Sequence, residues 1–226
     1  RPPIVLLENV AGFLTSHAGR DFQSALLALN RLGYAVDPLI IDAAQFLPQS
    51  RVRLFVVGSM QNGKGMWRIK ETPSFYESDV RPKQLADFIF NHPEIVWNIR
   101  ELPALPVTAP TLVDILEDLP ETSSFWWNQA RQDYLINQMS EKHAAQLKKM
   151  IAGNKWTYGT VFRRIRNGRS MAELRNDSIA GCLRTPRGGS ARQILIKAGY
   201  GQVKVRLMTP RECARLMGAD DFVIKR

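Results

Sequence analysis

The first part of the chain alternates apolar runs with polar breaks, at the spacings of strands and a helix. Ile4–Leu7 is a continuous apolar run, the pattern of a strand buried on both faces. From Asp21 onward, apolar residues beginning with Phe22 and Leu26 recur at helical spacing. Gly33 follows as the residue expected just beyond the end of that helix.

Two further apolar stretches, Tyr34–Asp42 and Val52–Ser59, predict two more strands. Strand, helix, strand and strand in this order predict the tail of an α/β sheet. Ligands of such sheets bind outside the carboxyl ends of the parallel strands. Glu8 stands at such an end, so we expect it at a ligand site.

The second part of the chain is less regular. Gln61–Gly65 is a turn-rich linker, and the proline-punctuated stretch after it is left unassigned. The pattern predicts a short acidic helix at Thr111–Leu119 and a longer helix within Trp126–Met150. A last helix begins at Thr209-Pro210, with proline at its first position, and ends at Gly218.

Charge changes this picture more than overall composition does. A hydrophobic content of 45% is ordinary, but the formal net charge of +10 favours polyanionic partners. Membrane roles are disfavoured, because no apolar run reaches the length of a spanning helix. Scattered histidines and two cysteines without paired spacing predict no metal site and fit a reducing cytoplasm. A start on Arg1 leads us to expect a piece of a longer protein.

Most of the positive charge is concentrated between Lys148 and Arg206. Fourteen basic residues stand there against two acidic ones, Glu173 and Asp177. A solvated basic face is the alternative, but this density favours a phosphate-binding surface. The glycines of Arg184–Arg192 let backbone N–H groups approach a phosphate or a base edge. The candidate nucleic-acid-binding residues are Arg163, Arg164, Arg166, Arg184, Thr185, Arg187, Gly188, Gly189, Ser190 and Arg192.

Two other features have a structural and a functional interpretation. The aromatic cluster Phe125–Trp127 suits packing in a core better than it suits stacking on bases. Cys213 lies among apolar neighbours of the last helix, so we expect a packing thiol.

Three polar side chains at strand ends outline a candidate pocket. Glu8 stands at the tip of one strand, and Arg51 and Arg53 stand at the entry to another. One carboxyl group and two guanidiniums suit a planar, polar and nearly neutral ring. An ordinary strand-end carboxylate and surface ion pairs are the structural alternative.

Three motifs in this order resemble the cytosine-5 DNA methyltransferases. Glu8-Asn9-Val10 matches the ENV motif of that family, and Gln49-x-Arg51-x-Arg53 matches its QxRxR motif. Arg206–Gly218 (RLMTPRECARLMG) matches the helix that follows the family's target-recognition domain. The resemblance implies the back part of a Rossmann-like S-adenosylmethionine-dependent methyltransferase sheet plus a mixed, basic target-recognition domain. Residues 1–62 would be catalytic, 63–204 linker and recognition domain, and 205–226 the following helix.

The resemblance also implies a chemistry. The family flips a cytosine out of the duplex, a cysteine thiolate attacks C6, C5 takes the methyl group from S-adenosylmethionine, and β-elimination frees the product. Glu8 would donate a proton to N3, provided burial keeps it protonated, and Arg53 would hold O2. Arg51 would support the nearby phosphate and the catalytic loop. Asn9 would brace that loop, and Gln49 the strand junction.

The chain departs from the family pattern at both ends. The glycine-rich cofactor motif, the Pro-Cys-Gln nucleophile loop and the final asparagine-containing motif are missing, and neither Cys182 nor Cys213 has the nucleophile's context. We therefore expect part of a DNA (cytosine-5-)-methyltransferase that binds no cofactor itself and is inactive alone. Its expected partners are double-stranded DNA and an N-terminal methyltransferase portion or subunit carrying the catalytic cysteine. The expected location is the bacterial cytoplasm, at the nucleoid.

Two other classes stay open. One is a non-catalytic DNA-binding subunit or module that retains the fold remnant as a scaffold. The other is an RNA methyltransferase of the same fold, which the long insert between the two late motifs disfavours.

Overall fold

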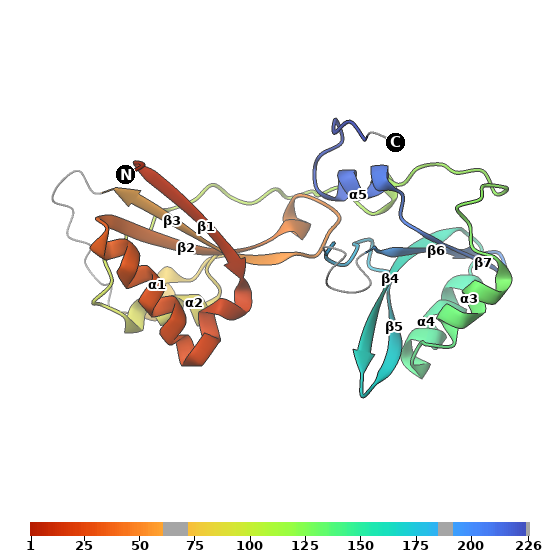
Figure 1. Ribbon diagram of the computed structural model, residues 1–226, viewed down its shortest axis with the longest axis horizontal. Helices are drawn as coiled ribbons and strands as arrows, with labels where there is room; N and C mark the ends of the chain where they lie inside the picture. Colours follow the sequence, from red (N-terminus) through yellow and green to blue (C-terminus); the bar gives the residue numbers. More distant parts are fainter. Residues whose placement is uncertain (61–71, 185–191, 225–226) are drawn as a thin grey trace. The chain divides into compact units, whose positions relative to one another are not determined.

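The computed structural model describes residues 1–60, 72–184 and 192–224, which form two compact units (Figure 1). The first unit comprises Arg1–Asp42 and Val52–Pro106, and the second comprises Ala43–Arg51 and Val107–Arg226. These bounds differ from the predicted domains, because the segment up to Pro106 contributes to the first core and the last helix contributes to the second unit. The functional meaning of the predicted domains stays a prediction.

The first unit is built on a three-stranded sheet with two helices. The strands β1 (Ile4–Val10), β2 (Tyr34–Asp42) and β3 (Val52–Met60) lie in the order β1-β3-β2. Both β1 and β2 pair antiparallel with β3, so they run in the same direction. Helices α1 (Arg20–Arg31) and α2 (Lys83–Asn91) pack against this sheet (Figure 1). The core combines both helices with the sheet through Phe22, Leu26, Val36, Leu54, Val56, Leu85 and Ile89.

The three predicted strands and the first helix are confirmed, and Gly33 adopts φ +91° just after that helix. The predicted burial of the first strand is wrong. Ile4 and Leu6 are 60% and 64% exposed, because β1 is an edge strand that pairs with β3 alone among the described strands.

Strand register assigns each residue of β1 to a face of the sheet. Leu7 lies opposite Val56, a core residue, so Leu7 shares the helix-covered face. Leu6 and Glu8 point to the other face, which we call the outer face of the first sheet.

The second unit contains a four-stranded antiparallel sheet in the order β5-β4-β6-β7. Its strands are β4 (Thr157–Arg166), β5 (Arg169–Arg175), β6 (Ile194–Gly199) and β7 (Gln202–Leu207). Helices α3 (Gln129–Ile136) and α4 (Glu141–Ile151) bury Leu135, Leu147 and Met150 against it, together with the inward residues of the strands.

Two predicted helices of this unit differ from the structure. The stretch Trp126–Met150 holds two helices, α3 (Gln129–Ile136) and α4 (Glu141–Ile151), because the backbone between them pairs with β5 instead of continuing a helix. The predicted helix at Thr111–Leu119 is one 3-10 turn, Val113–Ile115, since neighbouring backbone groups bond to residues distant in sequence.

The last predicted helix is confirmed as α5 (Pro210–Leu216). Thr209 and Glu212 form a reciprocal capping box, and Gly218 follows the helix with φ +69°. Further 3-10 turns lie within Ala11–Gly19, Ala43–Gln45 and Pro73–Tyr76. Within the described residues, every helix is too short or too polar to cross a membrane.

Candidate functional site

The strand register brings Glu8 and Arg53 together on the outer face of the first sheet. Val10 lies opposite Arg53 and Glu8 opposite Phe55, so the two charged residues are diagonal neighbours on one face. Arg53 Nε donates to Glu8 Oε1 at 3.0 Å. Arg53 also donates from Nη1 to the Val52 carbonyl at 2.8 Å, which fixes the plane of its guanidinium. A carboxylate and a guanidinium therefore lie side by side on one face of the sheet.

The two side chains differ in burial. The Glu8 side chain is 48% exposed and that of Arg53 is 19% exposed. The predicted burial of Glu8 is therefore wrong for this chain by itself, because its side chain lies half exposed on an edge strand. Asn9, predicted to brace a catalytic loop, accepts a hydrogen bond from the Val10 N–H at 2.8 Å.

Gln49 fastens the loop Ala43–Arg51 to the rest of the second unit. Its side chain is buried, its Nε2 donates to the Leu216 carbonyl at 2.7 Å, and its Oε1 accepts from the Leu183 N–H at 2.9 Å. The Ser50 N–H also donates to the Ala180 carbonyl at 2.9 Å. One amide side chain thus joins the loop, the end of α5 and the segment around Leu183.

The QxRxR motif is divided between the units. Arg53 belongs to the first unit, whereas Gln49 and Arg51 belong to the second. Arg51 Nη1 donates to the Cys182 sulfur at 3.3 Å. The structure therefore places Arg53 beside Glu8. It places Arg51 beside Cys182, and the sequence did not indicate that second contact.

The basic residues of β4 point to two faces of its sheet. Strand alternation turns Arg164 and Arg166 to one face and Arg163 to the other. Glu173 lies between the first pair, 3.6 Å from Arg164 Nε and 3.0 Å from Arg166 Nη2. Arg163 is half-buried, and its buried Nε has no hydrogen-bond partner among the described atoms. Arg163 therefore does not share the face of Arg164 and Arg166, and nucleic-acid binding by the three arginines stays a prediction.

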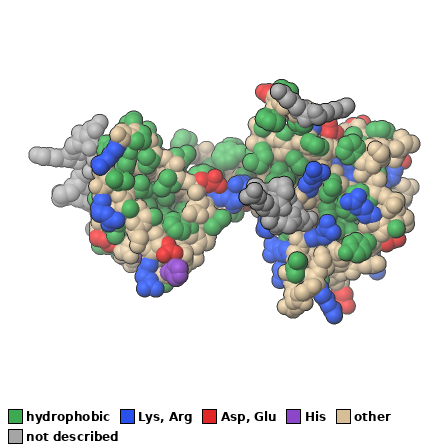
Figure 2. Space-filling model, viewed as in Figure 1, with side chains coloured by type: hydrophobic (Ala, Val, Ile, Leu, Met, Phe, Trp, Pro, Cys, Tyr) green, Lys and Arg blue, Asp and Glu red, His purple; other side chains and the backbone are tan. Residues whose placement is uncertain are grey.

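The other predicted nucleic-acid contacts flank an undescribed segment. Arg184 and Arg192 are exposed on either side of it. Figure 2 shows Lys and Arg side chains gathered on the visible face of the second unit. The predicted contacts that lie outside the described residues are Thr185, Arg187, Gly188, Gly189 and Ser190.

Arg206 is a structural residue, although it counted toward the basic segment. Its side chain is 1% exposed and donates to both carboxylate oxygens of Glu212, at 2.6 and 2.7 Å. Glu212 also accepts the Thr209 and Glu117 backbone N–H groups, and the Thr209 hydroxyl donates to the Glu117 carboxylate. This buried network explains why Arg206 and Glu212 occur together in the last motif, and it removes Arg206 from any phosphate-binding surface.

The aromatic cluster is largely structural. Trp127 packs against the core of the second unit and stacks under Arg131 at 4.0 Å. Trp126 donates from Nε1 to the Pro120 carbonyl, while Phe125 is 49% exposed. Core packing therefore holds for Trp127, as predicted.

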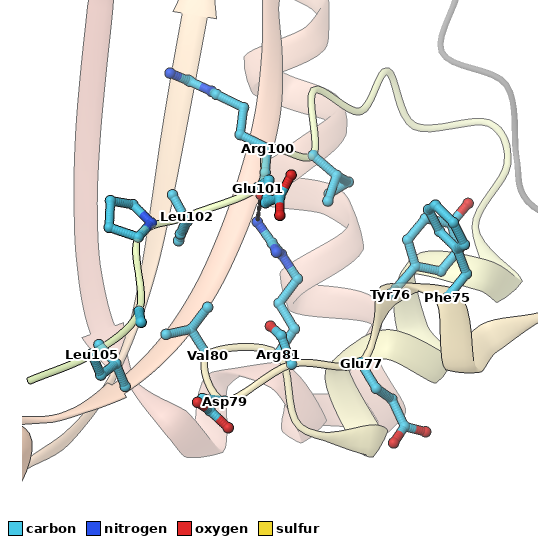
Figure 3. Close-up of a pocket in the computed structure, with 14 residues that line it drawn as sticks. Phe75, Tyr76, Glu77, Asp79, Val80, Arg81, Arg100, Glu101, Leu102 and Leu105 are labelled. Atoms are coloured by element: carbon cyan, nitrogen blue, oxygen red, sulfur yellow. Dashed lines mark hydrogen bonds between the residues drawn. The ribbon is translucent and has the colours of Figure 1, made fainter. Parts of the chain in front are cut away.

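The first unit also has a cavity of about 710 Å³ that none of the predicted site residues lines (Figure 3). Arg81 crosses it and donates to the Arg100 carbonyl at 2.9 Å. Arg81 also donates to the buried Asp37 at 2.7 Å. Burial raises the pKa of Asp37, and the hydrogen bond from Arg81 opposes that rise.

Comparison with known proteins identifies the family of this chain. A family described as C-5 cytosine-specific DNA methylase matches residues 1–225. The chain belongs to this family. A DNA-cytosine methyltransferase of Escherichia coli K12 is 28% identical over 241 residues, covering 96% of this chain and 42% of that protein. The type II methyltransferase M.DsaV of Dactylococcopsis salina is 29% identical, covering 99% and 49%.

The chain spans about half the length of these curated relatives of the C-5 cytosine methylase family. Among solved structures, the methyltransferase EhMeth of Entamoeba histolytica covers 99% of this chain and 53% of its own chain. Its TM-score is 0.49 at 12% identity.

C-5 cytosine methylases take their methyl group from S-adenosylmethionine. Among the described residues, a glycine-rich loop that opens a helix would suit such a cofactor. The one G-x-G sequence of the described residues, Gly199–Gly201, instead forms the tight turn between β6 and β7, with Tyr200 and Gly201 at φ +53° and +75°. The described residues also contain no group of His, Cys, Asp and Glu side chains that could hold a metal ion.

Proposed function

We propose that this chain is the back part of a DNA (cytosine-5-)-methyltransferase, supplying DNA recognition and one wall of the cytosine pocket. Family membership supports the reaction, and the contact between Glu8 and Arg53 carries the residue assignment. The ring N3 and O2 of cytosine lie side by side on one edge. A carboxyl group and a guanidinium that are 3.0 Å apart on one sheet face match that edge.

The chemical role of Glu8 follows from where charge develops. Nucleophilic attack on C6 places negative charge in the ring, and a proton donated to N3 neutralises it. Arg53, held by the Val52 carbonyl and Glu8, would keep its guanidinium against O2. Arg51 and Asn9 would support the backbone phosphate and the catalytic loop, and Gln49 would hold Arg51 in place through the loop that it fastens.

Glu8 requires a cover to act as a proton donor, because burial is what favours a protonated carboxyl group. We propose that an N-terminal methyltransferase portion, on the same polypeptide or a separate subunit, supplies this cover together with the nucleophilic cysteine and the S-adenosylmethionine site. The isolated chain would then be inactive.

The edge strand β1 supports this partner. Ile4, Leu6 and Val10 are all more than half exposed on the outer face, where Glu8 also points. Covering the exposed part of Leu6 alone would contribute about 1–2 kcal/mol. Leu6→Lys should therefore weaken association with the partner and leave the fold of the free chain unchanged, because Leu6 is already exposed to water.

Nucleic-acid binding would rest on the exposed arginines of the second unit. Arg164, Arg166, Arg184 and Arg192 are the described candidates. The segment of residues 185–190 remains part of the proposal. The proposed setting is restriction-modification in a bacterial cell, since one relative is a type II methyltransferase.

The test is reconstitution of the complete assembly with duplex DNA. Glu8→Gln should lower methyl transfer by about 100-fold or more, the usual contribution of a general acid, while duplex affinity is preserved. Glu77→Gln is a matched control, because Glu77 is an exposed carboxylate of the same unit away from the sheet. Unchanged methylation by Glu8→Gln in an active assembly would reject the catalytic role.

A non-catalytic DNA-binding module is the second candidate. The exposure of Glu8 and its ion pair with Arg53 favour it, since both are features of an ordinary surface. This candidate predicts that duplex binding by the chain is complete without a partner and that Glu8→Gln leaves every measured property unchanged.

A further inference from the structure

One end of the second sheet is a ribbon of two strands. β4 pairs with β5 as far as Arg166 and Arg169, but it pairs with β6 only over Thr157–Val161. Beyond that range the described residues place no third strand beside β4, and the two strands lead away from β6 and β7 (Figure 1). Asn167 and Gly168 close the ribbon with φ +49° and +73°, the backbone of a tight hairpin turn.

The ribbon carries positive charge and leaves it exposed near its tip. Its two strands contain five arginines and one acidic residue, Glu173. Arg166 and Arg169 lie directly opposite each other, and both are exposed. Like charges in that arrangement repel each other and destabilise a hairpin, and the ion pair of Arg166 with Glu173 offsets only part of this cost. An anion beside the tip would remove the rest, so the ribbon suits a polyanionic partner.

Ile165 is the apolar residue near the tip of the ribbon. It stands between Arg164 and Arg166 in the sequence, and it is 80% exposed. It shares a face with Ala172, a buried core residue, because Arg163 lies opposite Ala172 and strand residues alternate. The packing that buries Ala172 therefore ends before Ile165. A single exposed apolar side chain is ordinary on a protein surface, but this one is set among guanidiniums at the end of a ribbon.

The dimensions of the ribbon suit the major groove of duplex DNA. That groove is about 12 Å wide and admits a two-stranded β-ribbon, whereas the minor groove is about 6 Å wide. Two strands about 4.8 Å apart, together with their side chains, exceed the width of the minor groove. Among the base-edge groups of the major groove, the methyl group of thymine is the apolar one. Ile165 therefore matches a thymine, and the guanidiniums beside it match phosphates.

We propose that the β4–β5 hairpin enters the major groove and that Ile165 contacts the methyl group of a thymine in the recognised sequence. Arg166 and Arg169 would lie toward the phosphates that border the groove. This inference rests on the proposed function and assigns part of its sequence specificity to one apolar side chain. The sequence alone did not single out Ile165 or Arg169.

The first experiment compares two DNA fragments of one sequence, amplified with either thymidine or deoxyuridine triphosphate. Uracil differs from thymine only by the missing methyl group, so the comparison removes the proposed contact and keeps the base pairing. The complete assembly should methylate the thymine fragment with a kcat/KM at least about fourfold higher, the effect of burying one methyl group. Ile165→Ala should reduce that ratio to near 1, and Ile165→Val should retain most of it.

Val107→Ala is the matched control for the loss of an apolar side chain. Val107 is fully exposed and belongs to the same unit, outside the hairpin. This variant should leave the thymine-to-uracil ratio unchanged. Circular dichroism should show the wild-type fold for Ile165→Ala, because the exposed Ile165 contributes little to the core.

The second experiment tests the placement of the ribbon separately from the methyl contact. Arg169→Gln should weaken binding of the complete assembly to both fragments equally and reduce the slope of log K against log[salt] by about 1. Ile165→Ala removes no charge and should leave the slope unchanged. Arg31→Gln, a change at an exposed arginine of the first unit, should also retain the slope.

Two results would overturn the inference. One is a thymine-to-uracil ratio near 1 in wild type, or a ratio that Ile165→Ala leaves unchanged, in an active assembly. The other is an unchanged salt slope in Arg169→Gln. Either result leaves the proposed function standing, whereas failure of the complete assembly to methylate both fragments would refute the proposed function and this inference together.

Discussion

The buried pair of Arg206 and Glu212 should dominate the stability of the second unit. Both side chains are at most 1% exposed and share two hydrogen bonds. Removing one partner of such a pair leaves the other charge buried without compensation, which costs about 3–5 kcal/mol. Arg206→Met and Glu212→Gln should therefore each destabilise the chain by about that amount.

The double variant distinguishes the charge from the packing. Arg206→Met with Glu212→Gln removes both charges, and the glutamine oxygen can still accept from one of the two backbone N–H groups that Glu212 holds on separate oxygens. The pair costs desolvation as well as contributing attraction, so the double variant should lie within about 1–2 kcal/mol of wild type. The coupling free energy between the two sites would then be several kcal/mol.

Urea unfolding followed by tryptophan fluorescence measures these differences, because Arg206 lies over the Trp126 ring at 5.2 Å. With an m-value of about 2 kcal/mol/M, a loss of 3–5 kcal/mol moves the midpoint down by about 1.5–2.5 M. Two outcomes contradict this reasoning. Either each single variant costs less than about 1 kcal/mol, or the two costs add in the double variant.

Three further predictions concern other parts of the second unit. Gly199→Ala should prevent stable folding, since a Cβ there would lie 2.2 Å from the Lys155 carbonyl oxygen. Gly201→Ala meets nothing within 4 Å and should cost about 1 kcal/mol of folding free energy for its positive φ. Circular dichroism and urea unfolding compare the two variants. Gln49→Met should cost about 2–4 kcal/mol by leaving two buried backbone groups unpaired, and a cost near zero would contradict its role as a fastener. Burial raises the pKa of Cys213, so its alkylation should increase at higher pH than that of a cysteine peptide. The free energy of unfolding should fall above about pH 9, where the thiol ionises first in the unfolded chain. An alkylation profile that matches the peptide would refute this.

Local patterns determined the elements that depend on short-range interactions. The strands around Glu8 and Arg53 follow from apolar runs, α1 from helical spacing, and α5 from the proline at its first position and the glycine after its end. The order of the three motifs predicted the family, which the match over residues 1–225 confirms. Such features need only neighbours in sequence, so the sequence displays them directly.

Tertiary structure decided which of these residues act together. Strand alternation separated Arg163 from Arg164, and the division into units separated Arg51 from Arg53. Burial removed Arg206 from the basic surface, although its charge is the same in the sequence as that of any other arginine.

The partners that decide these outcomes are far apart along the chain. Gln49 bonds to a residue 167 positions away, and Glu212 accepts from one 95 positions away. Composition and spacing carry no information about such contacts, because they arise only when separate elements pack. The sequence by itself named the candidate residues. The fold determined that Glu8 lies exposed beside Arg53 and that Ile165 lies exposed near the tip of a hairpin.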